Sequence, residues 1–206
     1  MAAERLELSR GHAEALMPMV DRVCRAAETP PGAFDRLAVT IGPGHFTSLR
    51  VGLAAARGLA LASGRPLIGV TTLDAVAAAV PADRRTGAIV MVALDSKRAE
   101  AYVQSFDATL APLDRPAARI PAEYGAELAA RQIRIVAAGD AAERVAEEAR
   151  RRGAAIDVIA AIRHPDAAVV AALAASAALP AAAPAPLYIH PVQTTSPSKA
   201  AFGVSS

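Results

Sequence analysis

The stretch "IGPGHFTSLRVGLAAARGLAL", residues 41–61, constrains the fold of this chain more than any other part of the sequence. It follows the apolar strand pattern "RLAVTIG" and leads through a glycine-rich turn into a helix predicted over residues 48–63. "PLIGV" (66–70) then reads as a buried strand, and a helix over 72–80 ends at Pro81. This alternation is typical of an α/β layer with a parallel sheet.

Two further elements are predicted before this stretch. "RLELS" (5–9) alternates apolar and polar residues as a strand does, and residues 12–27 place apolar residues at helical spacing. Pro18 falls inside that helix, so we expect the helix either to kink or to begin near Met17. The first part of the chain therefore has βαβαβα order.

A second α/β unit follows the polar segment "PADRRTG" (81–87). "AIVMVAL" and "AEAYVQSF" are two strands that "DSKR" joins as a hairpin. The remaining predicted elements are strands within 132–139 and 155–159, a helix over 140–152, and a helix over 166–179 that Asp166 caps. We accordingly divide the chain into an N-terminal lobe (1–83), a C-terminal lobe (84–179) and a loosely attached tail rich in Pro, Ala and Ser (180–206).

Composition excludes several classes of protein. With 206 residues, 53% of them hydrophobic, the chain is long and apolar enough to bury a core. Its net charge of +2 is spread along the length, with one run of three arginines at 150–152, so the sequence does not favour direct binding of nucleic acid. Cys24 is the single cysteine, which excludes an internal disulfide and agrees with a cytoplasmic location. The apolar stretch 167–179 is too short to span a bilayer, so we expect no membrane partner.

The glycine-rich turn allows two interpretations. Free amides at the start of the following helix could bind an anion, through a site made of Gly42, Gly44, His45, Thr47 and Arg50. However, the P-loop pattern is absent, no lysine precedes position 97, and Pro43 lacks an amide hydrogen. The sequence favours the second interpretation, a tight turn in which Gly42 and Gly44 supply unusual backbone dihedrals.

The helix behind the turn carries glycines in its interior, at Gly52 and Gly58. Each costs about 1 kcal/mol relative to alanine, so close packing against another backbone should offset the cost. That backbone belongs either to a partner protein or to this chain, and spacing alone does not decide. The partner surface that we predict comprises His12, Leu16, Met17, Val20 and Cys24 of the 12–27 helix, and Gly52, Leu53, Ala56 and Leu59 of the next.

Several motifs together resemble one known family. "GPGHFTSLRVGLAAARGLALASGRPLIGVTTLDAVA" resembles the block GPGSFTGLRVGLATAKGLA and P-IGVSTL of the TsaB (YeaZ) family. "GHAEALMPMVDRV", "ALDSKRAEAYVQSF" and "APLYIHP" are similar to three further motifs of this family, in the same order. The resemblance covers residues 5–106 and 184–191. It implies a two-lobed α/β fold of the actin-like ATPase (ASKHA, ribonuclease H-like) superfamily.

The resemblance also implies a function. TsaB-like subunits take part in making threonylcarbamoyladenosine, next to the anticodon of tRNAs that read ANN codons. They are not catalysts there: a helical bundle in the first lobe pairs with the TsaD transferase, and the TsaE ATPase joins the two. We therefore expect a TsaD-like and a TsaE-like partner, a homodimer when alone, only indirect contact with tRNA, and no cofactor of its own, with ATP or ADP at the interface of the complex.

The sequence departs from the family pattern at two places. His45 stands where the family usually has serine, and Ser48 where it usually has glycine. The strand, turn and strand with which family members usually begin have no counterpart before Glu4. From this we expect a first sheet with an open edge and a chain poorly equipped to hold ATP.

Two other functions remain as alternatives. A glycoprotease-like metallopeptidase would need paired histidines, but His12, His45, His164 and His190 are scattered along the sequence. An ASKHA-type kinase would need a carboxylate in the cleft. Asp95 and Glu100 are the candidates, and their position at a strand turn is more typical of turn structure.

Overall fold

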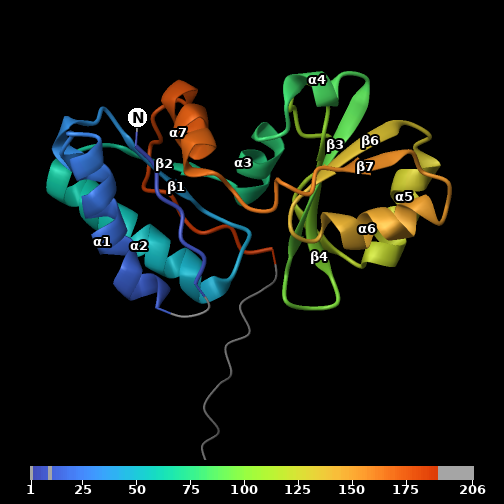
Figure 1. The fold of residues 1–206 in the computed structure, drawn as a ribbon, viewed down its shortest axis with the longest axis horizontal. Helices are drawn as coiled ribbons and strands as arrows, with labels where there is room; N and C mark the ends of the chain where they lie inside the picture. Colours follow the sequence, from blue (N-terminus) through green and yellow to red (C-terminus); the bar gives the residue numbers. More distant parts are fainter. Residues whose placement is uncertain (1, 9–10, 190–206) are drawn as a thin grey trace, which may run out of the picture.

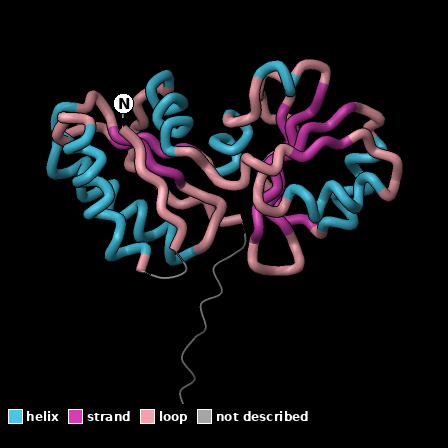
Figure 2. Tube along the Cα trace, viewed as in Figure 1, coloured by secondary structure: helices cyan, strands magenta, loops and turns pink. Residues whose placement is uncertain are grey.

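The computed structural model describes residues 2–8 and 11–189, and it contains two β-sheets that lie side by side with helices around each (Figures 1 and 2). The first sheet pairs β1 (Leu37–Thr40) with β2 (Leu67–Val70) in parallel, so that Leu37 lies opposite Leu67. The second sheet has five strands in the order β5-β4-β3-β6-β7. The two-lobed α/β architecture is therefore as the sequence predicted.

The centre of the second sheet is β3 (Ala88–Asp95), in which every residue except the last is buried. It pairs antiparallel with β4 (Ala101–Phe106) and parallel with β6 (Arg134–Ala138). The short strands β5 (Ala117–Arg119) and β7 (Ile156–Val158) form the edges. A strand without apolar and polar alternation is typical of a sheet covered on both faces.

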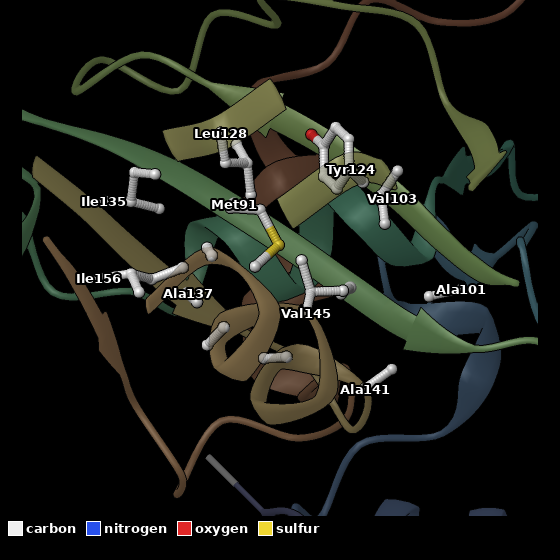
Figure 3. Close-up of a cluster of buried hydrophobic side chains, with 14 residues drawn as sticks. Met91, Ala101, Val103, Tyr124, Leu128, Ile135, Ala137, Ala141, Val145 and Ile156 are labelled. Atoms are coloured by element: carbon white, nitrogen blue, oxygen red, sulfur yellow. The ribbon is translucent and has the colours of Figure 1, made fainter. Parts of the chain in front are cut away.

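Helices cover both faces of this sheet. On one face, α5 (Pro121–Ala130) and α6 (Ala142–Arg150) pack against Met91 and Ile135 (Figure 3). On the other, α3 (Thr72–Ala78) places Leu73 and Val76 against β3, β4 and β6. Because α3 follows directly on β2, it joins the core of the second sheet to the first lobe.

The first lobe has helices on both sides of its small sheet. α1 (His12–Ala26) packs along α2 (Phe46–Ser63), and α2 contacts β1. α7 (Ala167–Ser176) covers the opposite side, where Figure 1 shows it away from α1 and α2. The predicted C-terminal lobe (84–179) therefore does not match the packing, because α7 lies within that range but packs on the sheet of the first lobe.

One core cluster and two hydrogen bonds show why α7 returns. Val170 and Ala174 of α7 are buried together with Ile68 and Val70 of β2. Arg36, just before β1, donates hydrogen bonds to the backbone oxygens of Ala174 and Ala177, each at 2.9 Å. The apolar pattern of this helix predicted its existence but carried no information on the sheet it would cover.

Most predicted elements form near their expected bounds, and Asp166 accepts a hydrogen bond from Ala168 N at 2.7 Å as the predicted cap. Pro18 lies inside α1, which begins at His12, so the alternative of a start near Met17 is wrong, and the kink stays a prediction. The sequence missed η1 (Pro31–Ala33), β5 and α5, and it read the short helix α4 (Ala82–Arg85) as a linker.

The prediction of a strand over 5–9 is wrong for residues 5–8, which form no strand; Ser9 lies outside the described residues. In the described residues the first sheet consists of β1 and β2 alone, so residues 5–8 pair with neither strand despite their alternating pattern. The expected departure from the family, the lack of its initial hairpin, stays a prediction.

The predicted tail is attached at its start. Leu187 N donates to Ile41 O at 2.7 Å, and Pro184 O accepts from Arg57 at 2.6 Å. A Cβ added to Gly69 would lie 2.8 Å from the Pro184 side chain, so this segment packs closely on β2. Residues 190–206 lie outside the described part of the chain.

Candidate functional site

The glycine-rich turn after β1 is fixed by packing within the chain. Gly42 has φ of 103°, and a Cβ there would lie 2.9 Å from the backbone oxygen of Leu187. Its own carbonyl accepts from Thr72 N at 2.7 Å, which ties the turn to the start of α3. Gly42 therefore serves backbone geometry, as the sequence favoured.

Gly44 does not share this role, which corrects the prediction for the second glycine of the turn. Its φ lies outside the left-handed region, and a Cβ there would meet no atom within 4 Å. Gly44 is exposed, so an alanine fits this position without strain.

The start of α2 is only partly arranged as an anion site. His45 is the N-cap, and its side chain makes no capping hydrogen bond, while Thr47 is exposed. Arg50, which we expected beside the anion, instead hydrogen-bonds the Tyr188 hydroxyl at 3.1 Å and lies 3.7 Å above the Phe46 ring. Its guanidinium thus binds the C-terminal segment to α2.

A cavity of about 1020 Å³ lies between the two lobes at this point. Residues of the turn line it together with ionisable side chains from residues 7–14 and from the second lobe. They include Gly44, His45, Thr47, His12, Glu7, Glu14, Asp95, Lys97, Asp140 and His164. Carboxylates outnumber lysine and arginine here, which disfavours a polyphosphate.

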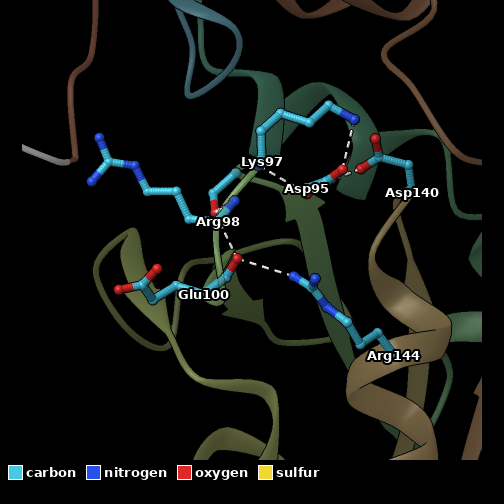
Figure 4. A network of polar contacts seen from close by, with 7 residues as sticks. Asp95, Lys97, Arg98, Glu100, Asp140 and Arg144 are labelled. Carbon is cyan, nitrogen blue, oxygen red and sulfur yellow. Dashed lines mark hydrogen bonds and ion pairs between the residues drawn. The ribbon is translucent and has the colours of Figure 1, made fainter.

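The charged groups of the second lobe are bonded to one another (Figure 4). Lys97 Nζ lies 2.6 Å from Asp95 Oδ2, and the Lys97 backbone N–H donates to the same carboxylate. Asp140 Oδ1 accepts from Asp95 N at 2.8 Å. The side-chain hydrogen bond from Lys97 lowers the pKa of Asp95, and the same bond raises the pKa of Lys97. Lys97, the lysine of this cavity, is therefore already paired with the carboxylate of Asp95.

The two carboxylates proposed for a kinase have structural roles or point elsewhere. Asp95 holds the turn of the β3–β4 hairpin through Lys97, which has a left-handed φ of 60°. The Glu100 carboxylate lies on the far side of the hairpin, and its backbone oxygen accepts from Ser96 and Arg144 (Figure 4). This arrangement is turn structure, as the sequence suggested.

The residues of the predicted partner surface differ in how far the structure exposes them. Leu53 is only 4% exposed and packs inside the chain, so it is removed from the surface. Met17 is 44% exposed and His12 is exposed as well. The others are half-buried where α1 packs along α2: Leu16, Val20, Cys24, Gly52, Ala56 and Leu59.

The outer side of α2 carries a residue that sequence reasoning missed. Leu61 is 87% exposed, and Ala54, Gly58 and Ala62 beside it on the helix are exposed too. Gly58 lies on this outer side, whereas Gly52 lies on the side of Ala56 and Leu59; a Cβ added at either glycine would meet no atom within 4 Å. The spacing 54, 58, 61 could have revealed this side as a second apolar strip, but the hydrophobic pattern does not say which strip the chain itself covers.

Other kinds of site find no support in the described part of the chain. There, no three His, Cys, Asp or Glu side chains gather closely enough to hold a metal ion. Nor do any of the helices described combine the length and apolar character needed to cross a bilayer.

Comparison with known proteins identifies the family. The family described as "TsaD: tRNA N6-adenosine threonylcarbamoyltransferase" matches residues 6–183. "YeaZ from Pseudomonas aeruginosa" superposes with a TM-score of 0.65 at 26% identity, over 80% of this chain and 76% of that one. The chain belongs to the TsaB/YeaZ family. The fold is thus the ASKHA, actin-like fold that the sequence resemblance implied.

Further relatives agree with this family. A second structure, of an uncharacterized Pseudomonas aeruginosa protein similar to the peptidase YEAZ, has a TM-score of 0.71 at 27% identity, over 89% of this chain and 86% of that one. The Escherichia coli "tRNA threonylcarbamoyladenosine biosynthesis protein TsaB" is 38% identical over 94 residues, 45% of this chain and 40% of that protein.

Transferases of the same group are similar as well. A tRNA N6-adenosine threonylcarbamoyltransferase of Anaeromyxobacter dehalogenans is 46% identical over 66 residues, 32% of this chain and 20% of that protein. The aligned part thus spans less than half the length of the curated relatives it matches.

Proposed function

We propose that this TsaB/YeaZ-family chain is a non-catalytic scaffold subunit in the synthesis of threonylcarbamoyladenosine in tRNA. Its role is to pair, through α1 and α2, with a TsaD-like transferase, which a TsaE-like ATPase joins. The observation that carries the proposal is the open space beside both interior glycines of α2: a Cβ at Gly52 or Gly58 would meet no atom within 4 Å, and Leu61, one turn from Gly58, is 87% exposed.

The energetics of α2 support a partner. A glycine in a helix interior costs about 1 kcal/mol relative to alanine. No atom of the described chain lies close enough to Gly52 or Gly58 to make glycine necessary there. The cost is offset when another helix approaches these backbone positions closely, as small residues allow.

Exposed apolar side chains of α1 and α2 also support self-association when the transferase is absent. Met17 of α1 and Leu61 of α2 are exposed apolar side chains that a second copy can cover. A two-fold pair buries the same patch on both copies, so homodimer and heterodimer would compete.

A scaffold role also agrees with the interlobe cavity. Lys97, which lines the cavity, is bonded to Asp95, and Arg50, in the second turn of α2, is bonded to Tyr188, so both cations are already engaged. We accordingly propose that the chain holds no nucleotide of its own and that ATP or ADP binds at the interface of the assembled complex. Contact with tRNA is then indirect, and the complex works in the cytoplasm.

Sedimentation of mixtures with the TsaD-like transferase tests the pairing. Gly52→Leu places a bulky side chain where the partner helix approaches, so both the homodimer and the mixed complex should weaken at least tenfold. Ala171→Leu is the matched control, because Ala171 is exposed on α7, on the other side of the first sheet. Unchanged pairing by a folded Gly52→Leu variant contradicts the proposed surface.

A further inference from the structure

Residues 2–8, called the strap from here on, run between the two lobes without forming helix or strand. Leu6, Glu7 and Leu8 line the interlobe cavity, and residues 3–7 also line a second cavity of about 400 Å³ beside the segment 164–167. The strap therefore has open space on both sides and separates two cavities.

One polar contact holds the strap to the body of the protein. Arg22 of α1 donates to both carboxylate oxygens of Glu4, with Nη2 at 2.6 Å and Nε at 3.1 Å. Arg5 pairs with Glu7, which lies within the strap itself. Across residues 2–8 and 11–189, no other hydrogen bond or ion pair joins the strap to the rest of the chain.

Apolar packing of the strap is also weak. Leu6 remains 49% exposed, Leu8 is half-buried, and residues 3–7 are all exposed. Segments with few buried contacts and no backbone hydrogen bonds open at the lowest free energy in a protein. The forked, bidentate geometry of the Arg22–Glu4 pair makes it the contact that selects the closed position.

We propose that the strap is a releasable wall of the interlobe cavity and that the Arg22–Glu4 pair is its latch. Breaking the latch frees residues 2–8 and opens the cavity toward the start of α2. The hydrogen bond from Arg22 lowers the pKa of Glu4, so the latch is charged at neutral pH. This inference does not depend on the pairing with a transferase.

A tryptophan placed in the strap reports its release, because the natural chain has no tryptophan. Leu6→Trp and Leu8→Trp are made separately, and acrylamide quenching is measured on the full chain. In each background the latch is broken by Glu4→Gln or by Arg22→Gln. Since Leu6 starts at 49% exposure, quenching at this position should rise about twofold on release, and by more at half-buried Leu8.

Two controls separate the latch from general effects on α1. Asp21→Asn breaks the neighbouring Asp21–Arg25 pair of the same helix and should leave quenching unchanged. The exchanged pair, Glu4→Arg with Arg22→Glu, should restore the value of the intact latch. Salt at about 1 M should also raise quenching with the latch intact, because an exposed ion pair is screened.

The outcomes decide the proposal. A rise at both tryptophan positions in both latch variants, reversed by the exchanged pair, supports a released strap. A rise at Leu6→Trp alone means a local change next to Glu4 and overturns it. Equal quenching with and without the latch, or an equal rise with Asp21→Asn, overturns it as well.

Discussion

Two glycines of the second lobe, Gly125 and Gly139, have surroundings opposite to those of the two glycines of α2. A Cβ at Gly139 would lie 2.1 Å from Ala93 O, and one at Gly125 would lie 2.9 Å from Ala149 N. At Gly52 and Gly58 it would meet nothing within 4 Å. At Gly125 and Gly139 glycine is therefore required by close packing within the chain, whereas in α2 the chain itself gives no reason for it.

The helices differ in the same way. α6 buries Ala142, Val145, Ala146 and Ala149 against the second sheet, whereas α1 has no fully buried residue. The second lobe has thus completed its packing, while the α1 and α2 layer retains apolar surface. Buried apolar side chains are thus concentrated around the second sheet, whereas α1 and α2 carry the exposed Met17 and Leu61.

The largest expected effect is at Gly139. Gly139→Ala forces a Cβ against the Ala93 carbonyl at a φ of 109°, so we expect a loss of about 3 kcal/mol or more in the free energy of unfolding. Gly153→Ala is the control, since its φ of 83° is also left-handed but its Cβ has open space. Denaturant titration should give about 1 kcal/mol for the control. Equal losses would mean that packing adds nothing at Gly139.

The two glycines of the turn after β1 allow a second comparison, between neighbouring positions. Gly42→Ala brings a Cβ to 2.9 Å from Leu187 O at a φ of 103°, and we expect it to cost about 2 kcal/mol and to loosen the C-terminal segment. Gly44→Ala should change stability by less than about 0.5 kcal/mol, since its Cβ is unopposed. Thermal unfolding of the two variants compares them directly. A larger loss at Gly44 would reverse our assignment.

A smaller effect is expected at Tyr124, which is buried among the helices of the second lobe (Figure 3). Its hydroxyl lies 2.6 Å from Ser105 Oγ, and Ser105 is fully buried. Tyr124→Phe leaves the Ser105 hydroxyl without its partner, so the free energy of unfolding should fall by about 1 kcal/mol at neutral pH.

The same residue predicts a dependence on alkaline pH. Burial raises the pKa of Tyr124 from 10.0 to about 12. The unfolded chain thus loses this proton before the folded chain does, and stability present below pH 10 falls as the pH rises toward about 12. Urea titrations across this range should show a shallower decline for Tyr124→Phe than for the natural chain. Parallel declines would exclude Tyr124 as the source.

The sequence predicted those features that depend on local pattern. The strand, turn and helix of residues 36–63 and the cap at Asp166 are confirmed, as is the family resemblance. The missed features depend on contacts between distant residues: Arg50 reaches Tyr188, and α7 returns to β2. Periodicity could not distinguish Gly42 from Gly44 either, since the chain segment that crowds Gly42 lies at Leu187.

The central claim is that the glycines of α2 serve a partner and not the chain. The most direct test replaces both, Gly52→Ala with Gly58→Ala, and measures the unfolding free energy of the chain alone together with its dissociation constant for the TsaD-like transferase. Since each new Cβ has open space, the chain alone should become more stable, by about 1–2 kcal/mol in total. Binding should weaken about tenfold or more as the partner helix is held away. A double variant that is less stable alone, or that binds as tightly as the natural chain, would contradict this account.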